Sequence, residues 1–286
     1  VGASSGNWMS RIRRSTPAQT YDQVLSDLTQ AETLLPDAAT RNRAVKATAR
    51  ALRARLHLYR QQWAEAEAYA TQVIGNANYG LVTPYRAIST APFLSREAIF
   101  ELTFSNADAN TMWNNWFPSA LGGQFNFQPV PAAVALLQDP AVGGSRSALL
   151  ASTTIAGNPV TYGNLYSRSA QRDDPSYVLR LAEQYLIRAE ARARQGKLAE
   201  ALADLNAVRA RAGVPASTAA TAEALLLAIE NERRVEFAFE ADRWFDLVRT
   251  GRAGAVLGVT DQCRWRFPIP FNDLVADPDL EQNPGY

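Results

Sequence analysis

One spacing of apolar residues occurs twice in this chain, and it constrains the fold more than any other feature. Both sets follow i, i+3, i+7 and i+10: Trp63, Ala66, Ala70 and Val73, then Leu198, Ala201, Leu205 and Val208. Each set follows a helical segment that carries an Arg-Ala pair, with a short turn between. Small residues at a crossing let two helices pack closely, and such tetratricopeptide-like pairs must stack to bury their faces. The chain is therefore predicted to be mainly α, with helical sections at residues 16–80 and 175–286.

Residues 81–174 have a different character and are predicted to form a loop-rich insertion. Residues 98–104, AIFELTF, alternate as a short strand does. The stretch that follows is rich in Asn, Gly, Ser, Pro and aromatic residues, and its aromatic content argues against disorder. Asp174 and Pro175 have the residue types of an N-cap and a first helical position, so helix is expected to restart over 176–195.

The run ENERRVEFAFEADRWFDLVR, residues 230–249, is predicted to be one buried helix. At 100° per residue, five charged residues share one stripe: Glu232, Glu236, Glu240, Arg243 and Asp246. Apolar residues cover much of the opposite side, which is typical of an interior helix. Because isolated buried charges are costly, these carboxylates are expected to pair with arginines in a structural ion-pair network. A glycosidase-type carboxylate pair is the alternative, and the arginines on the same stripe argue against it.

The same run also carries a family resemblance. It is followed by Phe267-Pro268-Ile269-Pro270 and by Gln282-Asn283-Pro284-Gly285-Tyr286. In this order, the three segments resemble the SusD/RagB family of nutrient-binding lipoproteins from Bacteroidetes. One departure is Ala241, where the family usually has Gly. The resemblance implies a single SusD-like domain over residues 1–286 with tetratricopeptide-like helix pairs.

The resemblance also implies a function and a location. It implies binding of a glycan or other nutrient at the outer face of the outer membrane, and delivery to a SusC-like TonB-dependent transporter. Family members are longer and carry a lipid anchor at the N-terminus, so this chain is expected to be a C-terminal fragment whose anchor lies elsewhere. The sequence contains no run of 18 to 20 apolar residues.

The composition excludes several other functions. Lys plus Arg is 29 and Asp plus Glu is 28, without the basic excess that a nucleic-acid-binding surface requires. With only Cys263 and His57, the chain has no disulfide and no His/Cys metal site. His57 lies off the apolar stripe of its helix and is expected to face solvent. Neither a phosphate-binding loop nor a nucleophile elbow is present, so no cofactor and no catalysis are expected.

The candidate ligand site lies in the insertion. Sugars present an apolar C–H face and a rim of hydroxyl groups, so aromatic rings beside amides and carboxylates suit them. The residues that offer this are Asp108, Trp113, Asn114, Asn115 and Trp116, with Tyr162 and Tyr166 as a second candidate. The tryptophans could instead seal the insertion onto the helices. In the nearby segment QFNFQ, residues 124–128, the phenylalanines are expected to pack.

A second function of another class also fits the pattern. Helix pairs of this kind form grooves for peptides or partner proteins, so a protein-interaction scaffold without a small ligand is the alternative. A hydrolase is the third possibility, and no residue pattern supports it.

Overall fold

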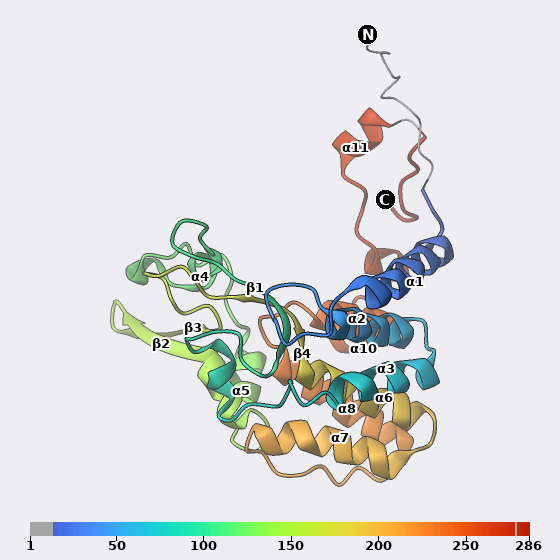
Figure 1. The fold of residues 1–286 in the computed structure, drawn as a ribbon. Helices are drawn as coiled ribbons and strands as arrows, with labels where there is room; N and C mark the ends of the chain where they lie inside the picture. Colours follow the sequence, from blue (N-terminus) through green and yellow to red (C-terminus); the bar gives the residue numbers. More distant parts are fainter. Residues whose placement is uncertain (1–13, 278) are drawn as a thin grey trace, which may run out of the picture. The chain divides into compact units, whose positions relative to one another are not determined.

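The computed structural model describes residues 14–277 and 279–286, which form two compact units. The larger unit is residues 25–243, and the terminal unit joins residues up to 24 with residues from 244 onward. Helices predominate in both, which confirms the expected mainly α fold (Figure 1). Over the described residues, no helix is long and apolar enough to cross a membrane.

The predicted helix pairs form the scaffold of the larger unit. The long helices are α1 (Pro17–Leu34), α2 (Lys46–Tyr59), α3 (Trp63–Ile74), α6 (Leu181–Arg194), α7 (Leu198–Arg211) and α8 (Ala222–Glu236), with the first turns of α1 in the terminal unit. Helix α2 packs on α3, α6 packs on α7, and α3 packs on α6. Ala54, Ala66, Ala70 and Ala191 are fully buried between them, so the backbones approach closely. The repeated spacing thus marks the faces that are buried.

A short antiparallel pair links the insertion to this scaffold. Strand β1 (Ala98–Leu102) pairs with β4 (Ser176–Arg180), and α6 begins only at Leu181. The expected helix start at Asp174 and Pro175 is therefore wrong. Pairing with β1 overrides local helix signals here, and the buried Asp174 carboxylate accepts a hydrogen bond from the Arg168 amide at 2.7 Å instead of capping a helix.

The insertion has more regular structure than the sequence indicated. Its elements are η1 (Tyr85–Ser89), α4 (Met112–Trp116), η2 (Ser119–Leu121), α5 (Pro131–Gln138), η3 (Gly144–Leu149), β2 (Leu150–Ile155) and β3 (Asn158–Gly163) (Figure 1). Strands β2 and β3 form a hairpin whose two turn residues, Ala156 and Gly157, both have positive φ, as a type I′ turn requires. A core that includes Tyr85, Leu149 and Leu165 joins the insertion to Val235 of α8.

His57 is buried, contrary to expectation. Its ring stacks on Tyr69 with 5.5 Å between centroids, and Nδ1 lies 2.7 Å from Oε1 of Gln62. The packing of α3 against α2 covers a helix face that the single-helix pattern assigned to solvent.

In the terminal unit, the last two motifs of the sequence bind each other. The elements there are α9 (Arg243–Arg249, of which Arg243 belongs to the larger unit), α10 (Ala253–Leu257), η4 (Gln262–Trp265) and α11 (Phe271–Ala276). The Gln282 side chain accepts from the Ile269 amide at 2.8 Å and donates to the Ile269 carbonyl at 3.0 Å. Asn283 donates to the Phe267 carbonyl at 2.7 Å. These bonds explain why Pro-Ile-Pro and Gln-Asn-Pro-Gly-Tyr occur together.

Candidate functional site

The predicted tryptophans lie on the short helix α4, and they have different surroundings. Trp113 packs against the core of the insertion and meets the buried Phe117 edge-on, with 5.7 Å between ring centroids. Trp116 lies between two rings, with its centroid 4.7 Å from that of Phe239 and 5.2 Å from that of Phe127. Both indoles are half-buried, so each contributes to packing and retains some exposed surface.

Close packing under Trp116 requires a glycine. A Cβ added at Gly163, the last residue of β3, would lie 2.8 Å from Cε3 of Trp116 and 3.2 Å from Cε1 of Phe239. Such a contact is shorter than van der Waals packing allows, so a larger residue would displace the ring. The hairpin therefore fixes the position of the indole.

Backbone hydrogen bonds bring a second segment of the insertion beside α4. The Gln124 amide donates to the Asn114 carbonyl at 2.7 Å, and the Phe127 amide donates to the Asn115 carbonyl at 2.9 Å. As a result, the Asn126 side chain donates to Oδ1 of Asn115 at 2.8 Å and to Oε1 of Gln124 at 3.1 Å. Phe127 packs on Trp116, as the sequence suggested, but it remains 48% exposed.

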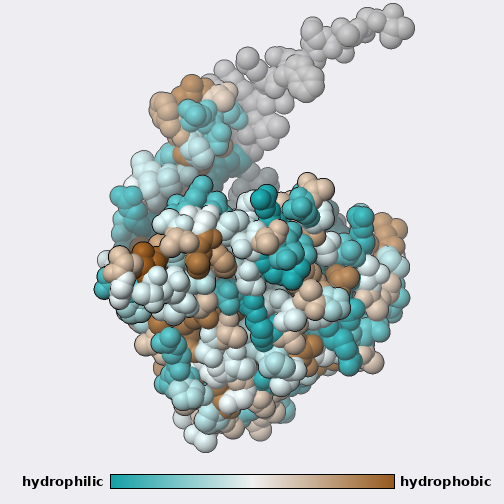
Figure 2. Space-filling model, turned by 90° about the vertical axis from the view of Figure 1, so that its left-hand side faces the viewer, coloured by the Kyte–Doolittle hydropathy of each residue, from teal (hydrophilic) through white to brown (hydrophobic). Residues whose placement is uncertain are grey.

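These contacts define an amide–aromatic platform, which consists of Asn115, Trp116, Gln124, Asn126 and Phe127. It combines two aromatic rings with three side-chain amides, each of which can donate and accept. Figure 2 shows the molecule with the insertion turned toward the viewer. Apolar side chains there lie in small groups among pale and polar residues, without one continuous apolar patch.

The other candidate residues lie elsewhere. Tyr162 and Tyr166 are 8% and 9% exposed and pack in the interior, so neither offers a ring face to a ligand. Burial raises the pKa of Tyr166 to about 12. Asp108 is exposed, but its backbone hydrogen bonds run to Ser105. The alternation of polar and aromatic residues did not distinguish the buried tyrosines from the half-exposed tryptophans.

The predicted single helix over residues 230–249 is wrong. Helix α8 ends at Glu236, Phe239 and Ala241 have positive φ, and α9 begins at Arg243. The five charged residues therefore do not share one stripe. Arg243 pairs with Glu230 at 3.1 Å and keeps 26% of its side chain exposed, while Asp246 pairs with Arg249 at 2.9 Å.

The buried glutamates pair with arginines from distant segments instead. Arg180, the last residue of β4, donates through Nε and Nη2 to Glu240, at 3.0 and 2.7 Å. Its Nη1 donates to Glu97 and Glu236, both at 2.8 Å, and Nη2 also donates to the Glu236 carbonyl. Arg146 and Arg209 hold Glu232, and Arg211 holds Glu236. We refer to Glu97, Glu232, Glu236, Glu240, Arg146, Arg180, Arg209 and Arg211 as the ion-pair cluster.

The pKa values of the carboxylates in the ion-pair cluster are shifted in different directions. Burial raises the pKa of Glu240 to about 7, although Arg180 opposes the shift. Burial also raises the pKa of Glu97, and its arginine neighbours only partly offset this. For Glu236, burial acts in the same direction, but Arg211, Arg180 and Arg146 outweigh it and lower the pKa. Burial and the guanidinium groups thus shift these pKa values in opposite directions, and the guanidinium groups prevail at Glu236.

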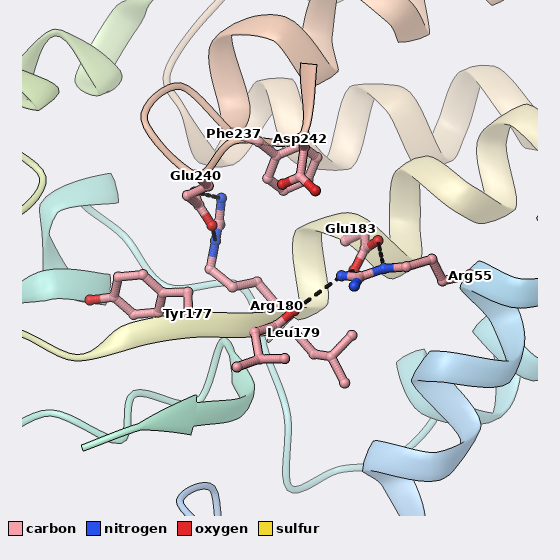
Figure 3. Close-up of a pocket in the computed structure, with 9 residues that line it drawn as sticks. Arg55, Tyr177, Leu179, Arg180, Glu183, Phe237, Glu240 and Asp242 are labelled. Atoms are coloured by element: carbon pink, nitrogen blue, oxygen red, sulfur yellow. Dashed lines mark hydrogen bonds and ion pairs between the residues drawn. The ribbon is translucent and has the colours of Figure 1, made fainter. Parts of the chain in front are cut away.

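A polar cavity of about 260 Å³ lies beside the ion-pair cluster (Figure 3). Arg55 donates to both carboxylate oxygens of Glu183, at 2.6 and 2.7 Å, and to the Val178 carbonyl. Arg180 and Glu240 face each other across from this pair (Figure 3). The charged groups are engaged with one another, which suits a structural role better than catalysis. Among the described residues, no group of His, Cys, Asp and Glu could hold a metal ion.

Comparisons with known proteins identify the family and support the fold. The model of the SusD family matches residues 154–260. A crystal structure of a SusD superfamily protein from Bacteroides vulgatus aligns with a TM-score of 0.80 and 30% identity, over 96% of this chain and 67% of that one. A laminarin binding SusD-like protein aligns with a TM-score of 0.75 and 27% identity, over 95% of this chain and 70% of that one.

A curated relative is also a SusD protein. The starch-binding protein SusD of Bacteroides thetaiotaomicron is 33% identical over 136 residues, which is 43% of this chain and 24% of that protein. The matched stretch covers about a quarter of the length of the curated relatives.

Proposed function

The chain belongs to the SusD family, and from this premise we propose that it binds a carbohydrate through the amide–aromatic platform without cleaving it. The observation that carries the proposal is the ring contact of Trp116 and Phe127 in the same two segments that hold three hydrogen-bonded side-chain amides. A sugar ring can stack on an aromatic face while its hydroxyl groups exchange hydrogen bonds with amides. The starch and laminarin named for two relatives belong to the same ligand class.

Capture without catalysis is supported by the state of the carboxylates. A glycosidase needs two carboxyl groups that reach the same glycosidic bond. Glu232, Glu236 and Glu240 each bind an arginine of the ion-pair cluster and are buried. Carboxylates engaged in this way suit a structural role.

Delivery is the second part of the proposal. As a member of this family, the protein would act at the outer face of the outer membrane, with a lipid anchor as its only link to the bilayer. It would pass its ligand to a SusC-like TonB-dependent transporter. Co-purification with such a transporter tests this part separately from ligand binding.

Affinity electrophoresis in gels that contain soluble starch, laminarin or xylan tests carbohydrate binding. The protein is expected to be retarded by at least one polysaccharide. Asn126→Ala should reduce that retardation, because Asn126 links the amides of Asn115 and Gln124 and is exposed. Phe271→Ala, which removes an exposed ring outside the insertion, is the matched control. Equal retardation of both variants and the unaltered protein would refute the platform.

A further inference from the structure

Charged residues are almost absent from the segment that forms the platform. Between Glu101 and Arg168 the sequence contains only Asp108, Asp139 and Arg146. A stretch of this length with one basic residue differs sharply from the remainder of the chain, where Lys and Arg are frequent.

The one basic residue of that segment cannot meet a ligand. Arg146 is 0% exposed, and it pairs with Glu232 and with Glu236 at 3.6 Å within the ion-pair cluster. Asp108 and Asp139 are both exposed. The charge that the segment shows to solvent is therefore negative.

The neighbouring segment contains two arginines, and one of them is paired with a carboxylate. Arg168 donates through Nε and Nη2 to the carboxylate of Asp173, which neutralises it. Arg172 is exposed, and its backbone carbonyl accepts from the amide of Asn110, which is not a platform residue, at 2.8 Å. All five platform residues are uncharged.

Recognition of a sulfate or carboxylate group normally uses Arg or Lys, because a charge-assisted hydrogen bond is about twice as strong as a neutral one. An anionic group that is desolvated against amides and rings, with no cation among them, loses hydration that these neutral groups do not fully replace. Hydroxyl groups of a neutral sugar have no such cost. We propose that the platform selects neutral glycans and discriminates against sulfated and uronic-acid-containing ones. This inference rests on the proposed carbohydrate binding.

Isothermal titration calorimetry with matched ligands tests this selectivity for neutral glycans. The probes are the neutral polysaccharide that binds in the gel screen, the same polymer after chemical sulfation, and polygalacturonate. We expect at least about tenfold weaker binding of the sulfated polymer and an affinity for the neutral one that does not change between low and high salt.

The outcomes separate the two proposals. Equal or tighter binding of the sulfated polymer would overturn the selectivity while leaving carbohydrate binding intact. If neither the neutral nor the anionic polymers bind, the proposed function itself fails and the selectivity fails with it.

A gain of function sharpens the test. Gln124→Lys places a cation beside Asn126 and Phe127, so it should improve binding of the sulfated polymer several-fold and make that binding salt-sensitive. Arg172→Ala, the control, should change neither ligand's affinity. If Gln124→Lys leaves sulfated-polymer binding unchanged, the absence of cations is not what sets the preference.

Discussion

The ion-pair cluster and the amide–aromatic platform differ in almost every physical respect. The cluster is buried, densely charged and built from segments far apart in the chain, whereas the platform is half-exposed, uncharged and confined to one insertion. Buried ion pairs tolerate little change because removing one partner leaves an uncompensated charge. A platform of rings and amides can vary its members and still bind sugars. The difference is consistent with a family signature that encodes the scaffold, and with our proposal that the insertion carries the ligand site.

The largest effect is expected from Arg180→Ala. Arg180 holds Glu97, Glu236 and Glu240, and its loss would leave three buried carboxylates short of a partner, at roughly 3 to 5 kcal/mol. Urea unfolding measures the loss. Arg243→Ala is the matched control: its partly exposed pair with Glu230 should contribute less than about 1 kcal/mol. Similar losses for the two variants would mean that Arg180 is not the centre of the cluster.

A pH-dependent effect of intermediate size is expected from Glu240. Because its folded pKa, about 7, lies above the ordinary value of 4.5, the folded state favours the protonated carboxyl. This contribution to stability is fully present below about pH 4.5 and is lost as pH rises through 7, by up to about 3 kcal/mol. Unfolding free energies across this range should decline less steeply in Glu240→Gln than in the unaltered protein. Identical slopes would show that Arg180 keeps Glu240 ionised throughout.

Gly163→Ala is expected to lower both the stability of the protein and its affinity for carbohydrate. The added methyl group would push Trp116 away, with an expected loss of about 1 to 3 kcal/mol in stability. Because Trp116 belongs to the platform, carbohydrate affinity should fall as well. Gly254→Ala, where a Cβ would have no neighbour closer than 3.6 Å, is the control for the substitution. If affinity stays the same although stability falls, the indole position does not matter for the ligand.

The sequence predicted the helix pairs because each buried face has a regular period in one short segment, as in Ala66 and Ala70 of α3. It also singled out Asn115 and Trp116, which are part of the platform proposed here. It could not predict that Arg146, Arg180 and Arg211 converge on Glu236, because nothing local marks an arginine whose partner lies on another element. The break after Glu236 was missed for a related reason. Residues 237–242 have helical periodicity, and tertiary contacts such as the Arg180–Glu240 pair accompany a different backbone path.

The exposure of Phe127 was not predicted, because exposure of a loop residue depends on backbone hydrogen bonds between segments. The bond from the Phe127 amide to the Asn115 carbonyl sets its ring beside Trp116 rather than in the core. His57 shows the opposite error, since a residue off the stripe of α2 was covered by Tyr69 of α3. In both cases the deciding partner lies outside the segment whose pattern was read.

The division between a structural cluster and a binding platform is tested most directly by Phe127→Ala. Its calorimetric affinity for the best neutral polysaccharide should fall about tenfold, which corresponds to about 1.4 kcal/mol, because the exposed ring face is lost. The melting temperature should remain close to that of the unaltered protein, since nearly half of the side chain is exposed at 48%. An unchanged affinity in a folded Phe127→Ala protein would contradict the assignment of ligand binding to the platform.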